Sequence, residues 1–328
     1  MDKEDTMNIL VTGGCGFIGS NFIRYFLREH PSTKIFNLDK LTYAGNPANL
    51  RDVESDARYK FVYGDICDAM LVKDLLKKEH IQTIVHFAAE SHVDRSITDA
   101  SYFIRTNVLG TFTLLDAALS ESVDRFIHIS TDEVYGSINK GSFGESDPLN
   151  PSSPYSASKA SSDLIARSYF ITHGLPVIIT RCTNNYGPYQ YPEKFIPLFI
   201  TNLLEGKKVP VYGSGTNVRD WIHVLDHCRA IDCVLQSGNP GEIYNIGGDN
   251  ERSNLEITHK ILNSLDKDYS WIEHVKDRPG HDFRYSLDSS KLKSLGWNLE
   301  SSFEEGLCET IEWYKSNTWW WHPLKHPQ

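Results

Sequence analysis

The sequence predicts an α/β protein with a doubly wound parallel sheet and a smaller, mixed α/β domain in its C-terminal part. Short β-branched apolar runs alternate with helix-length segments up to Thr180. A glycine-rich turn joins the first run to a helix, and an acidic residue ends the second run. After Thr180 the elements become shorter, and turn residues and aromatic residues become more frequent.

The predicted elements follow one another in a regular order. We expect strands at 7–11, 34–38, 59–63, 81–87, 126–131, 177–180 and 242–246. We expect helices at 20–29, 99–120, 153–173 and 303–316. The apolar run at 242–246 indicates that the chain returns to the main sheet, around 218–250. The predicted domains are therefore 7–185, with that return, and 186–328.

The composition is that of an ordinary globular protein and excludes several classes. A net charge of −10 argues against a nucleic-acid surface, because binding a phosphate backbone needs an excess of Lys and Arg. No apolar run is long enough to span a membrane, and the polar first residues do not resemble a signal peptide. The six cysteines are scattered without metal-binding spacing, so we expect reduced thiols, a cytoplasmic location and no metal.

The turn at 12–19, TGGCGFIG, has the pattern of a dinucleotide-binding turn. Its glycines allow a tight bend and let the backbone approach a pyrophosphate at the N-terminus of the next helix. Asp39, about twenty positions later, is placed to bind the adenosine ribose diol and would repel a 2′-phosphate. The sequence therefore predicts a Rossmann-type domain that binds NAD rather than NADP. The residues expected to bind the cofactor in this turn are Gly13, Gly16, Phe17, Ile18 and Gly19.

Two further strand ends are expected to border the cofactor. Asp65 and Ile66 follow the strand at 59–63, where a carboxylate and an apolar residue could flank an adenine. Ala88 and Ala89 follow the strand at 81–87. Small residues at that end leave room for a cofactor to lie across the edge of the sheet.

The candidate catalytic residues lie at the end of one strand and the start of the next helix. The run at 126–131 ends in Thr131, which Asp132 and Glu133 follow, so a buried strand would deliver a hydroxyl and two carboxylates to the sheet edge. Tyr155 and Lys159 are four residues apart and share one helix face, where an ammonium group favours the phenolate. Tyr155 is therefore expected to act as a base, although such a pair alone is also typical of an exposed helix surface.

Seven short motifs occur together after Met7, namely TGGxGFIG, FAAESHVDRS, STDEVYG, YSASK, NNYGPYQ, RDWIHV and RPGHD. With them the chain resembles the extended short-chain dehydrogenase/reductases, and within these the dTDP-glucose 4,6-dehydratases. STDEVYG is the discriminating motif. The similar 4-epimerases have small or neutral residues after the catalytic hydroxyl, and related decarboxylases and GDP-mannose dehydratases usually keep the glutamate alone.

The resemblance implies NAD-dependent dehydration of dTDP-glucose to dTDP-4-keto-6-deoxyglucose. Tyr155 would take the O4 proton while NAD accepts the C4 hydride, and Thr131 would hydrogen-bond O4. Lys159 would lower the Tyr155 pKa and hold the nicotinamide ribose, so both residues also count as cofactor contacts. Glu133 would remove the C5 proton and Asp132 would protonate the departing C6 hydroxyl, before the hydride returns to C6. Asp132 needs a raised pKa for this, which burial beside Glu133 could supply.

Substrate contacts follow from the same resemblance. Arg219 and Arg278 are loop-borne cations in an acidic protein, so they are candidates for holding a diphosphate, with ordinary surface salt bridges as the alternative. The residues expected to contact the substrate are Ser91, Asn184, Asn185, Glu193, Lys194, Arg219, Asn254, Arg278 and His281. The chain departs from the family pattern at Cys15, where alanine is usual, and at Phe283, where arginine usually follows RPGHD.

The sequence leaves alternatives open. A UDP-glucose 4,6-dehydratase shares the chemistry, and one methyl group on the base contributes only about 1 kcal/mol to the choice. A 4-epimerase is disfavoured by Asp132 and Glu133, and a non-catalytic NAD-binding regulator by the intact Tyr155 and Lys159. The helices near 99–120 and 153–173 are apolar on more than one face, which favours a homodimer, with simple burial in the core as the alternative.

Overall fold

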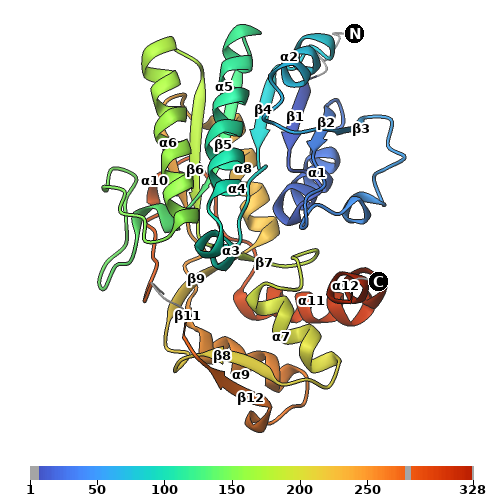
Figure 1. The fold of residues 1–328 in the computed structure, drawn as a ribbon, viewed down its shortest axis with the longest axis vertical. Helices are drawn as coiled ribbons and strands as arrows, with labels where there is room; N and C mark the ends of the chain where they lie inside the picture. Colours follow the sequence, from blue (N-terminus) through green and yellow to red (C-terminus); the bar gives the residue numbers. More distant parts are fainter. Residues whose placement is uncertain (1–6, 278–281, 327–328) are drawn as a thin grey trace.

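The computed structural model describes residues 7–277 and 282–326 and has two parts, a large α/β layer structure and a smaller part beneath it (Figure 1). The large part is built on a seven-stranded sheet with the strand order β10-β6-β5-β4-β1-β2-β3, in which every pairing is parallel. The strands are β1 Asn8–Thr12, β2 Lys34–Asp39, β3 Tyr59–Tyr63, β4 Thr83–His86, β5 Arg125–Thr131, β6 Val177–Cys182 and β10 Ile243–Ile246. The strand order reverses between β1 and β4, and such a reversal opens a crevice at the carboxyl ends of the strands.

Helices cover both faces of this sheet (Figure 1). On one face α1 Phe17–Glu29 and α8 Val224–Ser237 share an apolar cluster with the strands. On the other face α2 Ala69–Lys78, α5 Thr111–Ser120 and α6 Pro154–His173 share a second cluster. Burial on both faces explains why the strands read as nearly continuous apolar runs. The predicted fold class is confirmed.

Shorter elements connect these layers. They are η1 Pro47–Leu50, α3 Val93–Thr98, α4 Ser101–Phe103, η2 Ile104–Gly110, η3 Asp132–Tyr135 and α10 Ser290–Lys293.

The smaller part carries a three-stranded sheet and a two-stranded sheet. The first contains β11 Glu251–Ser253, β9 Val218–His223 and β7 Asn184–Tyr186, and the second pairs β12 Ile272–Val275 with β8 Val209–Tyr212. Its helices are α7 Phe195–Leu204, α9 Asn254–Ser264, η4 Tyr269–Trp271, α11 Phe303–Ser316 and α12 Thr318–Lys325. An apolar cluster that includes Trp320 and Trp321 forms the core of this part.

The long helix expected at 99–120 is interrupted. It begins as α4, continues as the π-helix η2 and becomes regular only in α5. Asn107 lies in the π-helical stretch, where its amide group donates to the Ser158 hydroxyl at 2.8 Å and to the Glu90 carbonyl at 3.0 Å. A π-helical turn commonly marks a place where a side chain must be directed to a specific contact, and the apolar periodicity cannot reveal it.

The chain returns to the large part after β9. β10 pairs with β6 and α8 packs on α1, whereas β9, at 218–223, belongs to the three-stranded sheet of the smaller part. The domain boundaries at 185 and 186 stay a prediction. Within the described residues, no helix has the length and apolar character needed to cross a membrane.

Candidate active site

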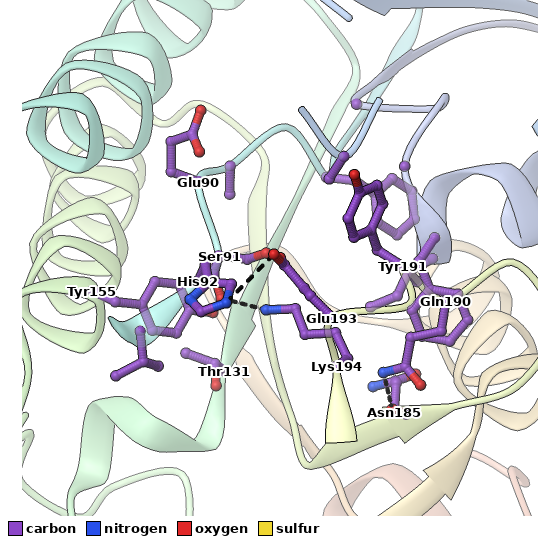
Figure 2. Close-up of a pocket in the computed structure, with 18 of the residues that line it drawn as sticks. Glu90, Ser91, His92, Thr131, Tyr155, Asn185, Gln190, Tyr191, Glu193 and Lys194 are labelled. Atoms are coloured by element: carbon purple, nitrogen blue, oxygen red, sulfur yellow. Dashed lines mark hydrogen bonds and ion pairs between the residues drawn. The ribbon is translucent and has the colours of Figure 1, made fainter. Parts of the chain in front are cut away.

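A cavity of about 510 Å³ lies at the carboxyl ends of the strands and is lined by residues of both parts. Figure 2 shows side chains from the strand ends of the large part facing side chains of the segment 185–194 across this space. Such a position between two lobes, at a reversal of strand order, is where open α/β sheets bind ligands. All the sequence-predicted site residues that the structure describes line this cavity.

The glycine turn is shaped for close approach of a ligand to the backbone. Gly13 has a φ of +71°, and a Cβ atom there would lie 2.6 Å from the backbone nitrogen of Ala88. A Cβ atom at Gly19 would lie 2.5 Å from the Gly13 carbonyl oxygen. The turn, the helix α1 and the end of β4 can therefore pack together only with glycine at these positions, as a dinucleotide site requires.

Asp39 ends β2 and is fixed to the glycine turn. Its carboxylate accepts hydrogen bonds from the backbone nitrogens of Cys15, at 2.9 Å, and Leu41, at 2.8 Å. Burial raises the Asp39 pKa, although these two hydrogen bonds oppose the shift. Cys15 is itself buried, and burial raises the pKa of its thiol to about 12, so it acts as a small neutral side chain. The departure from alanine at this position is thus accommodated.

The next two strand ends form the expected border of the cofactor site. Asp65 accepts a hydrogen bond from the Lys40 ammonium group at 2.8 Å, and Ile66 is buried next to it. Ala88 and Ala89 line the cavity at the end of β4. The residues present therefore fit a dinucleotide, with the glycine turn for the pyrophosphate and Asp39 for the adenosine ribose.

Thr131 ends β5, and the chain turns directly into the 3₁₀ helix η3. The Thr131 hydroxyl accepts from the backbone nitrogen of Glu133 at 3.2 Å and donates to Asp132 Oδ1 at 3.1 Å. This capping contact holds the three side chains at the mouth of the sheet. Asp132 is almost fully buried, whereas Glu133 is partly exposed.

The environment of Asp132 favours its protonated form. Burial raises the Asp132 pKa well above its ordinary value, and the negative charge of Glu133 raises it further. Within the described part of the chain, Asp132 Oδ2 is buried without a hydrogen-bond partner. A buried carboxyl group of this kind holds its proton near neutral pH and can donate it. The raised pKa expected from the sequence is therefore found.

Tyr155 and Lys159 lie on the first turns of α6, which begins after a capping box at Ser153. Tyr155 is buried and forms an edge contact with Phe103, with 6.3 Å between ring centroids. The Lys159 ammonium group is also buried and donates to the Ile129 carbonyl oxygen at 2.8 Å. Burial lowers the Lys159 pKa to about 8.

The Tyr155 pKa does not have the lowered value expected from the sequence. Burial raises the Tyr155 pKa well above its ordinary value, and negative charge at Glu133 raises it further, whereas a hydrogen bond with Thr131 lowers it. The sequence pattern placed the ammonium and the phenol on one helix face. It did not show that two carboxyl groups of η3, those of Asp132 and Glu133, lie near the phenol.

A buried polar group supports the catalytic residues from behind. Arg181 donates to Asp163 at 2.9 Å and to the Tyr135 hydroxyl at 2.7 Å. His128 lies 3.3 Å from the same aspartate, and burial lowers the His128 pKa to about 4. This group could not be identified from the sequence, because its members come from four separate elements, β5, η3, α6 and β6.

The expected substrate residues of the segment 184–194 are partly engaged with the protein. Lys194 donates to the Ser91 carbonyl oxygen at 3.1 Å, and Glu193 lies 3.6 Å from His92 (Figure 2). Asn185 is buried, and its side chain contacts the Thr183 carbonyl at 3.0 Å and His227 at 2.9 Å. Asn185 therefore shapes the wall through the protein's own hydrogen bonds.

The remaining expected contacts come from the smaller part. Arg219 is buried, with its guanidinium carbon 4.4 Å from the ring centroid of Tyr285, and donates to the Asp282 carbonyl at 2.8 Å. Asn184 and Asn254 line the cavity. Arg278 and His281 lie outside the described residues. Phe283 is 52% exposed and is not among the residues that line the cavity. The departure from arginine therefore leaves an uncharged side chain at this position, outside the cavity.

Sequence reasoning missed Glu90, Gln190 and Tyr191, which also line the cavity (Figure 2). Gln190 and Tyr191 lie in the stretch after Thr180 that is rich in turn residues and aromatic residues, so the sequence contains a signal for them. Glu90 could not be identified from the sequence, because its position depends on a contact with the π-helix. The backbone nitrogen of Glu90 donates a hydrogen bond to the Asn107 side chain at 2.8 Å.

Comparison with known proteins gives consistent results. The family model described as GDP-mannose 4,6 dehydratase matches residues 10–310. The dTDP-glucose 4,6-dehydratase of Streptomyces niveus is 55% identical over 326 residues, which cover 98% of this chain and 96% of that protein.

Two solved structures are also similar. DesIV, the dTDP-glucose 4,6-dehydratase of Streptomyces venezuelae with NAD and TYD bound, is 56% identical with a TM-score of 0.95, and the match covers 97% of this chain and 100% of that chain. The dTDP-glucose 4,6-dehydratase of Bacillus anthracis in complex with NAD is 52% identical with a TM-score of 0.92, and the match covers 97% of this chain and 99% of that chain. Similarity of this extent over almost the whole length shows that the chain belongs to the dTDP-glucose 4,6-dehydratase family.

Proposed function

We propose that this chain catalyses the NAD-dependent dehydration of dTDP-glucose to dTDP-4-keto-6-deoxyglucose. The observation that carries the proposal is the pair of adjacent carboxyl groups, Asp132 and Glu133, held beside Tyr155. Burial raises the pKa of Asp132, which favours its protonated form, whereas Glu133 is partly exposed. An acid and a base at one place are what the loss of water from a hexose requires, and oxidation at C4 alone needs neither.

The cofactor of the proposed reaction is NAD, which the relatives of known structure bind. When bound, NAD⁺ supplies the hydride acceptor for C4, the donor for C6 and a positive charge that favours ionisation of a nearby phenol. The glycine turn would hold its pyrophosphate and Asp39 its adenosine ribose. Asp65, Ile66, Ala88 and Ala89 would border its adenine and nicotinamide ends.

For the oxidation at C4, we assign Tyr155 as the group that accepts the O4 proton. Thr131 lies next to it and would hydrogen-bond O4, which keeps the hydroxyl group oriented. Lys159 would hold the nicotinamide ribose, and its pKa of about 8 leaves it mostly charged at neutral pH. Because the Tyr155 pKa is raised in this structure, the phenol must first release its proton to solvent before it can accept the O4 proton, and the positive charges of Lys159 and of bound NAD⁺ would favour that ionisation.

Elimination of water then depends on the two carboxyl groups. Oxidation at C4 acidifies the C5 proton, and Glu133 as carboxylate would remove it. The C6 hydroxyl is a poor leaving group, so Asp132 would donate its proton as the C6–O bond breaks and water forms. A proton returns to C5 at the end. The buried Oδ2 of Asp132 supports this role, because within the described residues this oxygen has no hydrogen-bond partner in the protein.

We propose further that the chain forms a homodimer through the helices near 99–120 and 153–173. α5 and α6 lie side by side (Figure 1), and large apolar side chains are exposed on these helices and on α4 and η2, which precede α5. They are Tyr102, Ile104, Leu109, Phe112, Leu164 and Ile171, each between 43% and 67% exposed. An apolar surface spread over two adjacent helices favours a second copy of the chain. The cytoplasmic location stays a prediction.

The substrate assignment is tested by incubating the purified protein separately with dTDP-glucose, UDP-glucose and GDP-mannose. We expect a 4-keto-6-deoxy product from dTDP-glucose, with kcat/KM about 5-fold lower for UDP-glucose, since one methyl contact contributes about 1 kcal/mol. Mass spectrometry of the products checks this. Turnover of GDP-mannose alone would overturn the assignment.

Asp132→Asn and Glu133→Gln should separate oxidation from elimination. Each variant should still reduce NAD in a single turnover. It should form the deoxy product at least about 100-fold more slowly than the wild type, because it lacks one proton-transfer group. Glu133→Gln should also lose deuterium incorporation at C5 in D₂O, measured by NMR. The control is Glu273→Gln, an exposed carboxylate outside the cavity. Normal elimination in Asp132→Asn would refute its role.

The same Asp132→Asn change should stabilise the fold. Because the folded-state pKa of Asp132 is raised, the folded protein holds a proton that the unfolded chain releases above about pH 4, so this group lowers stability as pH rises. Asparagine cannot ionise, so we expect the melting temperature to rise by about 1–3 °C at pH 7.5, and by less at pH 5. A gain that is equal at both pH values would contradict the raised pKa.

Leu164→Glu combined with Ile171→Glu should disrupt the dimer, because both side chains are exposed on α6 seven residues apart. Light scattering after gel filtration should give twice the chain mass of 37.3 kDa for the wild type and one chain mass for the variant. Tyr269→Glu, a 55% exposed aromatic residue in the smaller part, is the control and should remain dimeric. A wild-type protein of one chain mass would exclude the dimer.

A further inference from the structure

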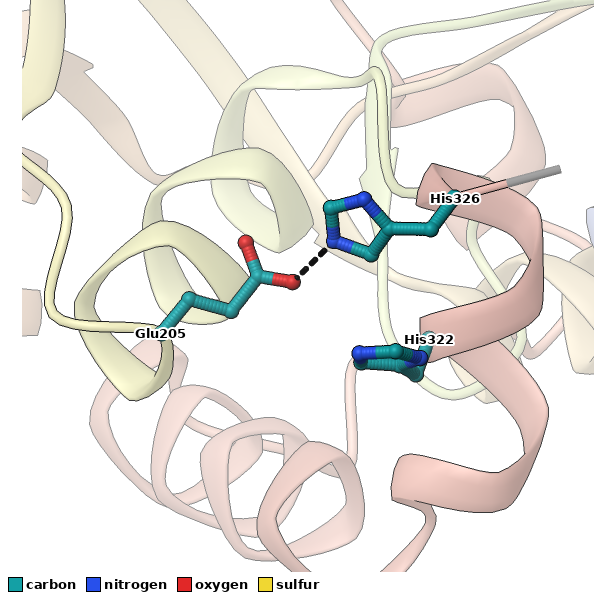
Figure 3. A group of neighbouring side chains, drawn as sticks. All are labelled: Glu205, His322 and His326. Carbon is teal, nitrogen blue, oxygen red and sulfur yellow. Dashed lines mark hydrogen bonds and ion pairs between the residues drawn. The ribbon is translucent and has the colours of Figure 1, made fainter.

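A cluster of three possible metal ligands lies away from the catalytic cavity, where α7 ends beside α12. Glu205 follows the last residue of α7. His322 lies on α12 and His326 directly follows its last residue, and Figure 3 shows both near the carboxylate. One ligand atom from each residue lies within 4.8 Å of the others. No further group of three such residues this close was found in the described segments.

The carboxylate of this cluster is already oriented by the protein. Glu205 Oε1 pairs with His326 Nε2 at 2.7 Å. Its other oxygen, Oε2, accepts from Lys207 at 2.9 Å and from Lys325 at 3.0 Å. Lys325 also donates to Asn202 at 2.8 Å, so the ammonium group is fixed on α7. The two lysines therefore hold one oxygen and direct the other to the histidines, as outer-shell partners of metal ligands do.

Glu205 is available as a charged ligand. Its side chain is only 12% exposed. The ammonium groups of Lys207 and Lys325 both donate to one of its oxygens, and two positive charges at that distance favour the ionised carboxylate that a metal ion needs.

The chemistry of the donor set selects the kind of ion. Two imidazoles and one carboxylate are typical ligands of Zn²⁺ and related divalent transition metals, whereas Mg²⁺ and Ca²⁺ prefer oxygen ligands alone. Metal–ligand bonds of about 2.0–2.1 Å in a tetrahedron place ligand atoms about 3.3 Å apart. The imidazole of His326 is 43% exposed, so rotation of exposed rings can close the remaining gap.

We propose that Glu205, His322 and His326 bind one divalent transition-metal ion of the Zn²⁺ class, with water in the fourth position. The ion takes the place of the hydrogen bond between Glu205 Oε1 and His326, and both lysines stay on Oε2. Their positive charge opposes the ion and weakens its binding. The site links the end of α7 to α12. It is therefore a structural metal site, called the staple below, that stabilises the position of α12.

This staple is connected to the cofactor turn. Trp320 of α12 donates from its indole nitrogen to Asn49 Oδ1 at 2.7 Å, and Asn49 donates to the Cys15 carbonyl oxygen at 2.8 Å. Trp320 and Asn49 both line the catalytic cavity. A metal ion that fixes α12 therefore also fixes one wall of the cavity, without contacting a reacting group.

The test is a titration of the full-length chain, stripped with a chelator and free of any affinity tag, with ZnCl₂ and with CoCl₂. We expect about one equivalent of Zn²⁺ to bind by calorimetry, a visible absorption band with Co²⁺, and a higher melting temperature with Zn²⁺. His322→Gln, His326→Gln and Glu205→Gln should each weaken Zn²⁺ binding tenfold or more.

The matched control is His173→Gln, an exposed histidine near the end of another helix, which should bind as the wild type does. Because His322 is exposed, its replacement leaves the fold intact and keeps the test decisive. Absence of saturable Zn²⁺ binding, or equal binding in the wild type and in His322→Gln, would overturn the proposal. Circular dichroism with and without Zn²⁺ checks the fold independently of any sugar-nucleotide turnover.

Discussion

The Asp132 carboxyl group is buried at the end of a central strand, and this burial governs the rest of the site. Removing a carboxyl group from water costs several kcal/mol unless it is paired or protonated, and burial accordingly raises the Asp132 pKa well above its ordinary value. Two charged residues of β9 affect the Asp132 pKa in opposite directions, since Arg219 lowers it and Asp220 raises it. The free energy gained by burying the two apolar clusters that flank the sheet offsets the cost of burying this carboxyl group.

The cavity joins two kinds of surface with separate origins. Backbone groups of the glycine turn and the ends of β2 and β4 form the side that suits a dinucleotide, and they are fixed by the parallel sheet. Side chains from β7, β9 and the segment 185–194 form the opposite side. Because these elements belong to the smaller part, its contacts can change with the ligand while the sheet keeps the reacting groups in place.

Sequence alone could predict the features that depend on local pattern. The strands, the glycine turn, Asp39 and the Thr131-Asp132-Glu133 end of β5 follow from periodicity and from the position of residues at strand ends. The π-helix around Asn107 could not be predicted, because its cause is a contact with Ser158 and Glu90. The direction of the Tyr155 pKa was missed for the same reason. The cluster at Glu205 was missed because Glu205 is more than a hundred residues away from the two histidines in the sequence.

The indole of Trp320 contacts Asn49 across 271 positions of the chain, and β10 closes the edge of the sheet beside β6. Both contacts involve residues made late in synthesis. The first six strands of the sheet can pair while the ribosome is still elongating the chain, but the wall behind the cofactor turn gains its last support only after the C-terminal helix has emerged. A polypeptide that is truncated before Trp320 would therefore contain every glycine of the turn and still lack the contact that holds Asn49 against it.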